Sequence, residues 1–249
     1  MYVLVHTVYG DGMASTEPPG DHRDGPGESG VDAAPGSLLQ ALDEGPARLG
    51  AGDVAAAQRR RMLAAMVATA AEKGYAATTV ADVVARARVS RATFYDQFAD
   101  KGDCFLAAFS ACAQSLARTL RDGIGPESRL TPRARVHATF TAYLADLAAF
   151  PEGAHVCLVE VHAAGPLAAE ARRAAQARFA AVLRDLHRAL ADDGEPVRPL
   201  TDFDFEALVG AVSSLVTTRV AAGAAADLPL LVEPLERFLL THFGLDPPL

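Results

Sequence analysis

The chain has 249 residues, half of them hydrophobic, no tryptophan, and a formal net charge of −8. This length allows one large domain or two modest ones, and the abundant alanine favours a helical core over a sheet. An acidic chain of this kind is not expected to bind nucleic acid unless its positive charge is gathered in one segment.

The positive charge is indeed unevenly distributed. Residues 1–53 carry nine acidic and two basic side chains, residues 58–101 carry four acidic and eight basic, and residues 102–249 carry eighteen acidic and thirteen basic. A basic segment between two acidic ones is typical of a phosphate-facing surface. We therefore expect any nucleic-acid-binding site within residues 58–101.

Residues 1–53 are predicted to be a disordered acidic tail. Residues 10–53 hold ten glycines and five prolines, a composition that cannot bury a core. Residues 25–30, GPGESG, match the GxGxxG dinucleotide fingerprint by chance, because no predicted strand precedes them and no helix follows. The tail is either an N-terminal extension or lies upstream of a later translation start.

Apolar segments and cysteines together predict a cytoplasmic protein. The first ten residues are apolar but too short to cross a bilayer, and no basic segment precedes them, so neither a membrane span nor a secretory signal is expected. Cys104, Cys112 and Cys157 form no CxxC pair. This is typical of reduced thiols buried as small hydrophobic side chains, with a redox sensor as the alternative.

The first predicted helix runs from Val54 to Lys73. Apolar side chains at spacings of three and four give it one apolar stripe, and Gly74 ends it. Three consecutive arginines lie near its start. They form either a solvated cluster or, for one or two of them, contacts with DNA phosphates, and we predict such a contact for Arg60.

Two short helices are predicted next. Thr79, with Asp82 three residues later, has the spacing of a capping box at the start of the first. Ser90 is a candidate cap for the second. Phe94 and Phe98 lie four residues apart, so they share one face of this second helix and can anchor it in a core.

Anchoring by the two phenylalanines leaves the other face of the second short helix free. This face carries small, basic, hydroxyl and amide side chains, which suit the DNA major groove. Arginine can pair with guanine, and glutamine can pair with adenine. The residues concerned are Arg91, Ala92, Thr93, Tyr95 and Gln97.

The sequence VSRATFYDQFADK, residues 89–101, resembles the recognition helix and the following lysine of the TetR family of transcriptional regulators. Residues 59–87 resemble the family's first two helices, so the resemblance covers about residues 55 to 110. It implies an all-α protein of about nine helices. It also implies a helix-turn-helix DNA-binding domain over residues 54–102 and an effector-binding and dimerisation domain over residues 103–249.

The resemblance further implies roles for individual residues. The phosphate-contacting positions are Thr93, Tyr95 and Lys101, the positions near base edges are Arg91, Ala92 and Gln97, and Arg60, Thr79 and Ser90 complete the predicted DNA-contacting set. Two residues depart from the family pattern. Arg88 stands where the turn usually has glycine, and Asp96 brings a negative charge towards the phosphates.

Six further helices are predicted in the rest of the chain. Capping residues, prolines and glycines mark their ends. The predicted segments are Lys101–Asp122 capped by Asp100, Pro132–Phe150 capped by Thr131, a shorter piece Ala154–Ala164 after an interruption at Pro151 and Gly153, Pro166–Asp192, residues 203–222 capped by Asp202, and Pro229–Phe243 stopped by Gly244.

An apolar effector pocket is predicted within these helices, where members of the family form one. The candidate lining residues are Phe140, Tyr143, Leu144, His155, Phe179 and Leu183. A group of metal-binding residue types, His155, Cys157, Glu160 and His162, lacks a metal-ligand spacing, so no metal is expected. The sequence has no nucleophile elbow and no P-loop, so neither catalysis nor a cofactor is expected.

The last two predicted helices are rich in apolar residues, which serve either an internal core or a four-helix interface with a second copy. The resemblance favours the homodimer. The residues are Ala207, Leu208, Val212, Leu215 and Val216 in the first helix and Leu231, Leu235, Phe238 and Leu239 in the second.

The predicted function is that of a repressor that leaves a palindromic DNA operator when a small, mostly apolar effector binds. Operator half-sites would lie about 34 Å apart, or a multiple of that distance, so that both recognition helices enter major grooves. An activator with the same DNA-binding domain is one alternative. The other is a small-molecule binding protein or enzyme on the same helical fold without DNA binding, which Asp96 and the acidic tail favour.

Overall fold

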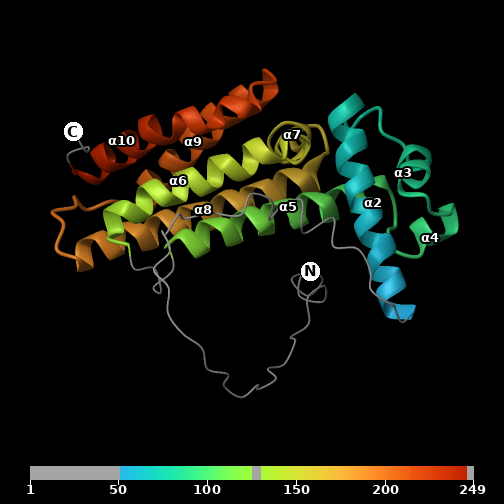
Figure 1. Ribbon diagram of the computed structural model, residues 1–249, viewed down its shortest axis with the longest axis horizontal. Coiled ribbons are helices and arrows are strands. Elements are labelled where there is room, and N and C mark those ends of the chain that lie inside the picture. The colour runs from blue at the N-terminus through green and yellow to red at the C-terminus, as the bar shows by residue number, and fades with distance from the viewer. Residues whose placement is uncertain (1–50, 125–129, 246–249) are drawn as a thin grey trace, which may run out of the picture. The chain divides into compact units, whose positions relative to one another are not determined.

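The computed structural model describes residues 51–124 and 130–245, which belong to one compact unit. Every regular element in these residues is a helix, so the predicted all-α class is confirmed (Figure 1). The elements are α2 Ala51–Lys73, α3 Val80–Ala87, α4 Arg91–Tyr95, α5 Lys101–Ile124, α6 Pro132–Ala149, α7 Pro151–Leu158, η1 Glu160–His162, α8 Pro166–Asp192, α9 Asp202–Ala221, η2 Ala225–Leu231 and α10 Val232–Phe243. Most of the predicted tail, with its GxGxxG match, lies outside the described residues.

The N-terminal part, which we call the head, consists of α2, α3, α4 and the beginning of α5. Apolar side chains at helical spacing form a core here, to which α7, η1 and α8 also contribute. The largest of them are buried: Met62, Met66, Phe94, Phe98 and Phe105. The predicted anchoring of the short helix by Phe94 and Phe98 is thus confirmed.

Helix ends in the head follow the predicted caps. Asp82 N–H donates to Thr79 Oγ1 at 3.2 Å, and Thr79 N–H donates to Asp82 Oδ2 at 2.8 Å, which completes the capping box of α3. At the start of α4, Thr93 N–H donates to Ser90 Oγ at 3.0 Å. Gly74 ends α2 with a φ of 82°, in the left-handed region that glycine adopts readily.

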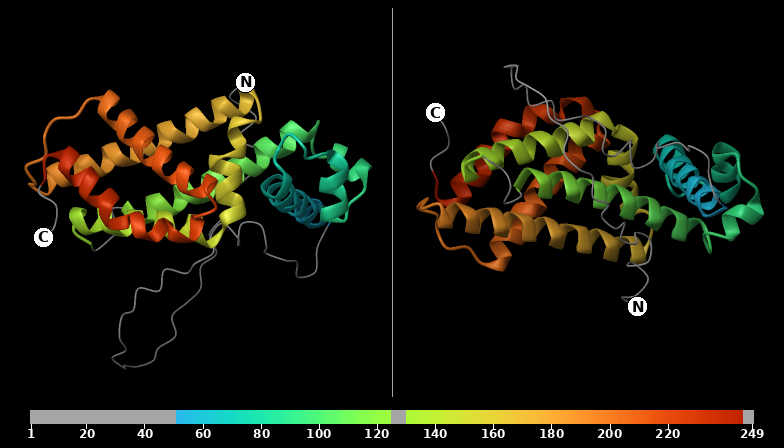
Figure 2. Two further views of the ribbon diagram at one scale, coloured as in Figure 1. Left: turned by 90° about the horizontal axis from the view of Figure 1, so that it is seen from above. Right: turned by 60° about the horizontal axis from the view of Figure 1, so that its bottom comes forward.

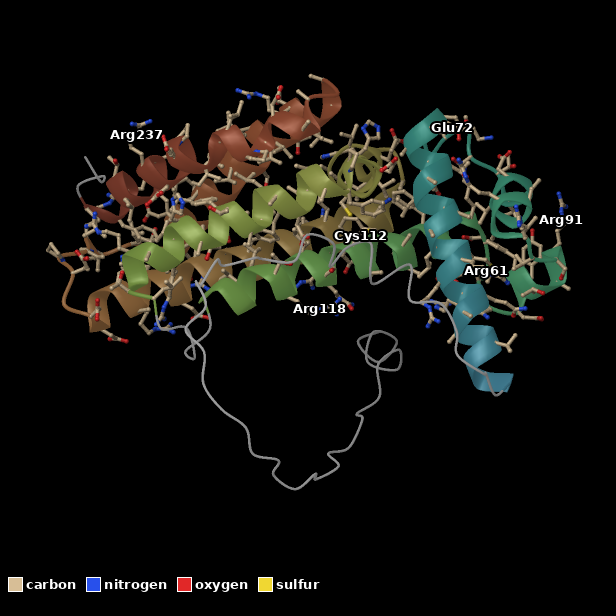
Figure 3. All side chains as sticks on the ribbon, viewed as in Figure 1. Arg61, Glu72, Arg91, Cys112, Arg118 and Arg237 are labelled. Carbon is tan, nitrogen blue, oxygen red and sulfur yellow. The ribbon has the colours of Figure 1, made fainter. Side chains whose placement is uncertain are left out.

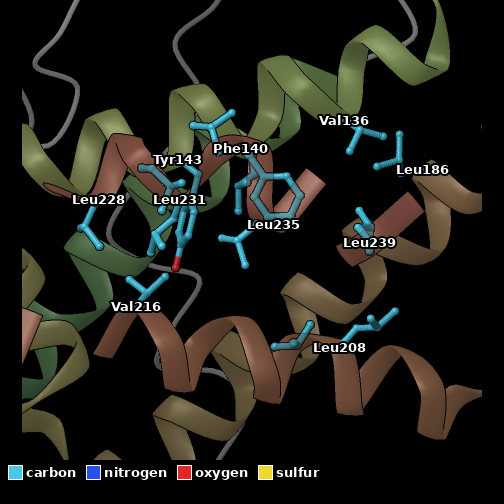
Figure 4. Close-up of a cluster of buried hydrophobic side chains, with 14 of the residues drawn as sticks. Val136, Phe140, Tyr143, Leu186, Leu208, Val216, Leu228, Leu231, Leu235 and Leu239 are labelled. Carbon is cyan, nitrogen blue, oxygen red and sulfur yellow. The ribbon is translucent and has the colours of Figure 1, made fainter. Parts of the chain in front are cut away.

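The C-terminal part, which we call the bundle, contains most of α5 and the elements from α6 to α10. α5 packs against α6 and α8, α8 packs against α9, and α10 packs on α6 (Figures 1 and 2). The apolar faces of these helices form a second core, part of which is drawn in Figure 4. Within the described residues, no helix is both long enough and apolar enough to cross a membrane.

Several helix boundaries in the bundle differ from the predictions. α5 continues through Gly123 to Ile124, and the predicted segment Ala154–Ala164 is divided between α7, which ends at Leu158, and η1. Pro151 begins α7 instead of interrupting the chain, because proline lacks an N–H and fits the first turn of a helix. Thr201, not Asp202, caps α9: its hydroxyl accepts from Asp204 N–H, and the Asp204 carboxylate accepts from Thr201 N–H at 2.7 Å. Pro229 lies inside η2, and α10 begins only after η2 ends.

Head and bundle share α5 and also meet at α7. α7 packs against α2, and Val156 in α7 and Val161 in η1 are buried in the core of the head. Gly153 permits this close turn, because a β-carbon there would collide with the Phe150 ring. A displacement of α5 or α7 therefore has to change the packing of the head.

Candidate functional site

Aromatic anchors hold α4 from one side. The buried rings of Phe94 and Phe98 have centroids 5.4 Å apart. The Arg59 guanidinium, from α2, lies 4.4 Å from the centroid of the Phe98 ring, and Arg59 Nη1 donates to Gln97 O at 3.2 Å. Stacking and hydrogen bonding by one planar group brace α4 against α2. No local pattern reveals this role of Arg59, because its partners lie almost forty residues away along the chain.

The opposite side of α4 faces outward. Arg91, Ala92 and Tyr95 are exposed, and Tyr95 keeps 55% of its surface accessible. Figure 3 shows the Arg91 side chain projecting from the outer side of the head. An arginine, a small side chain and a phenol on one exposed face can approach base edges and phosphates together.

Two other predicted DNA contacts are engaged inside the head. The Gln97 side-chain amide donates to Ala55 O at 3.0 Å. Lys101 Nζ donates to Tyr75 O at 3.0 Å and to Ala76 O at 3.4 Å, and it lies 4.3 Å from the centroid of the Tyr75 ring. An ammonium has three N–H donors, so Lys101 retains one for a phosphate, and the Gln97 amide retains a second N–H and its carbonyl oxygen beside the bond to Ala55 O.

The predicted hydroxyl contacts lie at helix starts. The Ser90 and Thr93 hydroxyls are 2.9 Å apart, and Thr79 Oγ1 donates to Asp82 Oδ2 at 2.6 Å. Arg60, also predicted to contact DNA, is partly buried in α2. The role of the hydroxyls in the free protein is to fix the starts of α3 and α4, on which the placement of any DNA contact depends.

Both departures from the family pattern lie beside α4. Arg88 has a φ of 54° and a ψ of 49°, a left-handed conformation that costs an L-residue about 1–2 kcal/mol. Its N–H closes α3 by donating to carbonyls of the last turn. Asp96 is exposed at the C-terminal end of α4, where a carboxylate repels phosphates.

Ion pairs fasten α3 to α2. Lys73 Nζ lies 2.6 Å from Asp82 Oδ2, and Arg86 Nη1 lies 2.8 Å from Glu72 Oε2. The hydrogen bond from Lys73, and then those from Thr79, lower the pKa of Asp82 to about 2. These contacts fix α3 relative to α2, and so they fix the point at which the turn to α4 begins.

Glu160 joins the bundle to the head. Its Oε2 accepts a hydrogen bond from Tyr75 N–H at 2.6 Å, and its Oε1 lies 3.3 Å from His155 Nε2. Two members of the metal-like sequence group thus serve this junction. Across the described ranges, no cluster of three or more metal-ligating side chains is found.

The cysteines lie in apolar surroundings. Cys104 and Cys112 are buried, and Cys157 is partly exposed. Burial raises the pKa of Cys104 to about 12. The pKa of Cys157 is raised mainly by a hydrogen bond with Cys112 and, to a smaller extent, by burial. A thiol that stays protonated is a poor nucleophile, so these side chains act as small apolar groups.

A small apolar cavity, which we call the inner cavity, lies within the bundle. Its volume is about 40 Å³, and four of the predicted pocket residues line it: Phe140, Tyr143, Phe179 and Leu183. The rest of the wall includes side chains from α5, α9 and α10. Figure 4 shows Phe140 and Tyr143 among the side chains that α6 contributes to the bundle core.

A second cavity of about 70 Å³, which we call the outer cavity, adjoins the inner one. Tyr143, Phe179 and Ser213 line both and so form the wall between them. The Tyr143 and Phe179 rings meet edge-on, with centroids 5.4 Å apart. The outer cavity also contains Arg172 and His162, so it is the more polar of the two.

The remaining two predicted pocket residues lie elsewhere. Leu144 is fully buried in the bundle core, and His155 lies at the junction with the head. Neither is among the described lining residues of the inner or the outer cavity. Val209 and Leu239, which do line the inner cavity, come from helices that only tertiary packing brings to α6, so no local pattern marked them.

Comparisons with known proteins agree with this architecture. The family model for bacterial regulatory proteins of the tetR family matches residues 62–108. No curated protein sequence matches the chain.

Three solved structures illustrate the likeness of fold. The transcriptional regulator FadR from Bacillus subtilis, in complex with stearoyl-CoA, has a TM-score of 0.65 and 19% identity over 73% of this chain and 97% of its own. The fatty acid degradation regulator FadR from Bacillus halodurans has a TM-score of 0.65 and 20% identity over 78% of this chain and 97% of its own. SmeT, the repressor of the Stenotrophomonas maltophilia multidrug efflux pump SmeDEF, has a TM-score of 0.62 and 18% identity over 74% of this chain and 89% of its own.

The family match covers one segment of the chain, whereas each structural likeness covers 73–78% of it. The match at residues 62–108 spans the head, from α2 through α4 into α5. The solved structures extend the same fold over the bundle, although identities this low speak for the fold alone. The chain is therefore TetR-like: residues 62–108 match the family model for bacterial regulatory proteins of the tetR family, and the described residues share their fold with solved transcriptional regulators.

Proposed function

We propose that this protein is a TetR-like transcriptional regulator, a homodimeric repressor that leaves a palindromic operator when a small, mostly apolar effector binds. The observation that supports DNA readout is the outward face of α4, where Arg91, Ala92 and Tyr95 are exposed while buried rings hold the helix from behind. Arg91 pairs with a guanine edge, Ala92 leaves room for the backbone to approach, and Tyr95 donates to a phosphate. Two copies of α4 enter major grooves about 34 Å apart, or a multiple of that distance.

The other predicted contacts position the head on the duplex. Arg60, Thr79, Ser90 and Thr93 lie on or beside the elements that carry α4, and they act on phosphates instead of reading bases. Lys101 does the same through its remaining N–H. The Gln97 amide, which has a second N–H and a carbonyl oxygen beside its bond to Ala55 O, turns towards a base edge when the head docks.

The effector binds in the bundle, at the two adjoining cavities. An inner volume of about 40 Å³ is far below the 300–1,000 Å³ of typical ligand pockets, so binding has to widen it. Parting the edge-on rings of Tyr143 and Phe179 would join the inner cavity to the outer one. The likeness in fold to a regulator solved with stearoyl-CoA supports a ligand with a large apolar part.

Widening the cavities reaches the head by two routes. α5 lines the outer cavity through Phe109 and continues directly into the head. α7 lines it through Cys157, and Glu160 beyond α7 holds the N–H of Tyr75. An effector that fits only the widened bundle thereby favours a different position of the head and releases the operator.

The dimer interface is formed by the outward sides of the last two α-helices. Five of the nine predicted interface residues are buried inside their own chain and serve its core: Leu208, Val216, Leu231, Leu235 and Leu239. Ala207 and Leu215 are exposed on α9, as are Phe203 at its start and Leu230 in η2. Large exposed apolar side chains of this kind favour contact with a second copy.

A gel-shift assay with DNA flanking the gene of this protein, at two salt concentrations, tests the proposal. Salt-sensitive binding to one palindromic site, reversed by an apolar ligand, is the expected result. The competing function is a ligand-binding protein that does not use DNA, which the exposed Asp96 and the internal bond of the Gln97 amide favour. A folded dimer that binds neither flanking DNA nor any sequence from a random pool would support that alternative.

A further inference from the structure

Among the described residues, Thr139 is the one whose buried side-chain polar atom has no hydrogen-bond partner. It lies on α6 in the wall of the inner cavity and is 4% exposed. Native proteins rarely keep such a group, because an unpaired buried hydroxyl costs about 1–3 kcal/mol. The bundle does pair the partly buried hydroxyl of Thr119, on α5, whose Oγ1 donates to Asp146 Oδ2 at 2.7 Å.

The surroundings of Thr139 define what can pair with it. The described lining of the inner cavity is apolar apart from the hydroxyls of Thr139, Tyr143 and Ser213, and it includes no charged side chain. Burial raises the pKa of Tyr143, so its hydroxyl also stays neutral. A charged ligand group would be desolvated here without a counter-charge. The suitable partner is therefore a neutral oxygen.

We propose that Thr139 is the hydrogen-bonding anchor of the inner cavity, and that the effector is an apolar molecule with a neutral hydroxyl or carbonyl oxygen on the part that enters this cavity. The inference rests on the proposed effector-binding function of the bundle. It goes further by naming the chemical class of the ligand group that the cavity recognises, a neutral oxygen. An anchored oxygen also fixes the apolar body against Tyr143 and Phe179, the rings that have to part.

A matched pair of probes tests the anchor: 2-naphthol and naphthalene, which differ by one hydroxyl. Dissociation constants are measured by titration calorimetry for the wild-type chain, Thr139→Val and Thr139→Ser. Valine keeps the branched shape and removes the hydroxyl, whereas serine keeps the hydroxyl. We expect Thr139→Val to weaken 2-naphthol by about tenfold and to leave naphthalene within about twofold, while Thr139→Ser retains the preference for 2-naphthol.

The stability of the free protein gives a second, independent readout. Removing a hydroxyl that makes no hydrogen bond loses no stabilising interaction. Thr139→Val should therefore melt at the same temperature as the wild type or higher. The control is Thr119→Val, which removes a paired hydroxyl from the same bundle and should lower the melting temperature. If Thr139→Val lowers it as Thr119→Val does, the Thr139 hydroxyl is already satisfied in the free protein, by a water for example, and the proposal is wrong.

Two ligand results also overturn the anchor. One is an equal change, or no change, for both probes in Thr139→Val. The other is a wild-type chain that binds neither probe, because its cavity then does not admit the class of molecule that we name. DNA binding is measured on the same preparations. Failure of the probe test with DNA binding intact removes the anchor alone, whereas a wild-type chain without DNA binding removes the proposed function.

Discussion

The head and the bundle differ in how they use polar side chains. In the head, polar groups cap helices, pair across α2 and α3, and brace α4, so that one face of a five-residue helix is held outward. In the bundle, the inner cavity is an interior with almost no polar groups, assembled from helices far apart in the sequence. A surface that reads DNA needs fixed side chains, whereas an interior that responds to a ligand has to yield.

The largest loss of stability is expected when a large buried side chain is shortened to alanine in either of the two cores. Phe94→Ala removes an anchor of α4 and should cost about 3–5 kcal/mol, with loss of DNA binding. Leu186→Ala lies in the wall of the inner cavity and should cost about 2–5 kcal/mol, but should leave DNA binding intact below the melting temperature. Denaturation curves and gel shifts measure both. Equal loss of DNA binding in the two folded variants would mean that the head and the bundle do not act separately.

Two arginines on α2 test whether the Arg59 contacts hold α4 in place, because Arg59 makes these contacts and Arg61 is exposed. Arg59→Gln removes the stack on Phe98 and the bond to Gln97 O, and should destabilise the head by about 1–2 kcal/mol. Arg61→Gln changes an exposed residue and should alter stability by less than about 0.5 kcal/mol. Urea unfolding of both variants is the measurement. Similar midpoints for the two would show that the Arg59 contacts do not brace α4.

The junction at Glu160 tests how the two parts communicate. Glu160→Ala leaves Tyr75 N–H without its acceptor and should cost about 1–2 kcal/mol while weakening the release of DNA by effector. Glu152→Ala, at an exposed position in the first turn of α7, is the control. Operator binding is titrated with and without ligand. Unchanged release in Glu160→Ala would place the coupling in α5 alone.

A smaller gain is expected at the left-handed turn of the head. Arg88→Gly removes the strain of a φ of 54° at an L-residue and should raise stability by about 0.5–1 kcal/mol. Arg88→Ala removes the same side chain but keeps a β-carbon, so it should give no such gain. Thermal melts compare the two. If Arg88→Ala stabilises the protein as much as Arg88→Gly, the arginine side chain, and not the left-handed backbone conformation, destabilises the wild type.

The smallest effect concerns the acid side of the stability curve. The pKa of Asp82 is lowered to about 2, below its ordinary value near 3.8, so the ionised form stabilises the folded head. This contribution is complete above that ordinary value and is lost as the pH falls towards 2. Asp82→Asn should therefore melt below the wild type at neutral pH, and the difference should shrink in acid. If the difference in melting temperature does not change with pH, Asp82 stabilises the head only through the capping box of α3 and not through its charge.

Much of the head could be predicted from the sequence because its signals are local. The capping box at Thr79 and Asp82, the cap at Ser90 and the pair Phe94 and Phe98 each lie within four residues, and each is found as expected. Arg59 shows the limit, since its partner ring lies far along the chain. Lys101 shows another, because its bonds to the Tyr75 and Ala76 carbonyls depend on how α5 meets the end of α2.

The bundle was less predictable because its site is not local. The sequence predicts α6 as Pro132–Phe150, close to the observed Pro132–Ala149, and two of its aromatic residues, Phe140 and Tyr143, do line the inner cavity. The walls from α9 and α10 depend on packing between helices, and so does the unpaired hydroxyl of Thr139, which sequence reasoning missed. A threonine in a helix carries no signal that its hydroxyl will lack a partner.

The central claim is that the outward face of α4 reads DNA, and selection of bound sequences from a random duplex pool tests it most directly. Wild type and Arg91→Ala are compared at the same salt concentration. We predict one palindromic sequence for the wild type, and a loss of preference at one base pair of each half-site for Arg91→Ala, worth about 1–3 kcal/mol. Identical preferences in the two chains, or no enriched sequence for a folded wild-type dimer, would contradict the claim.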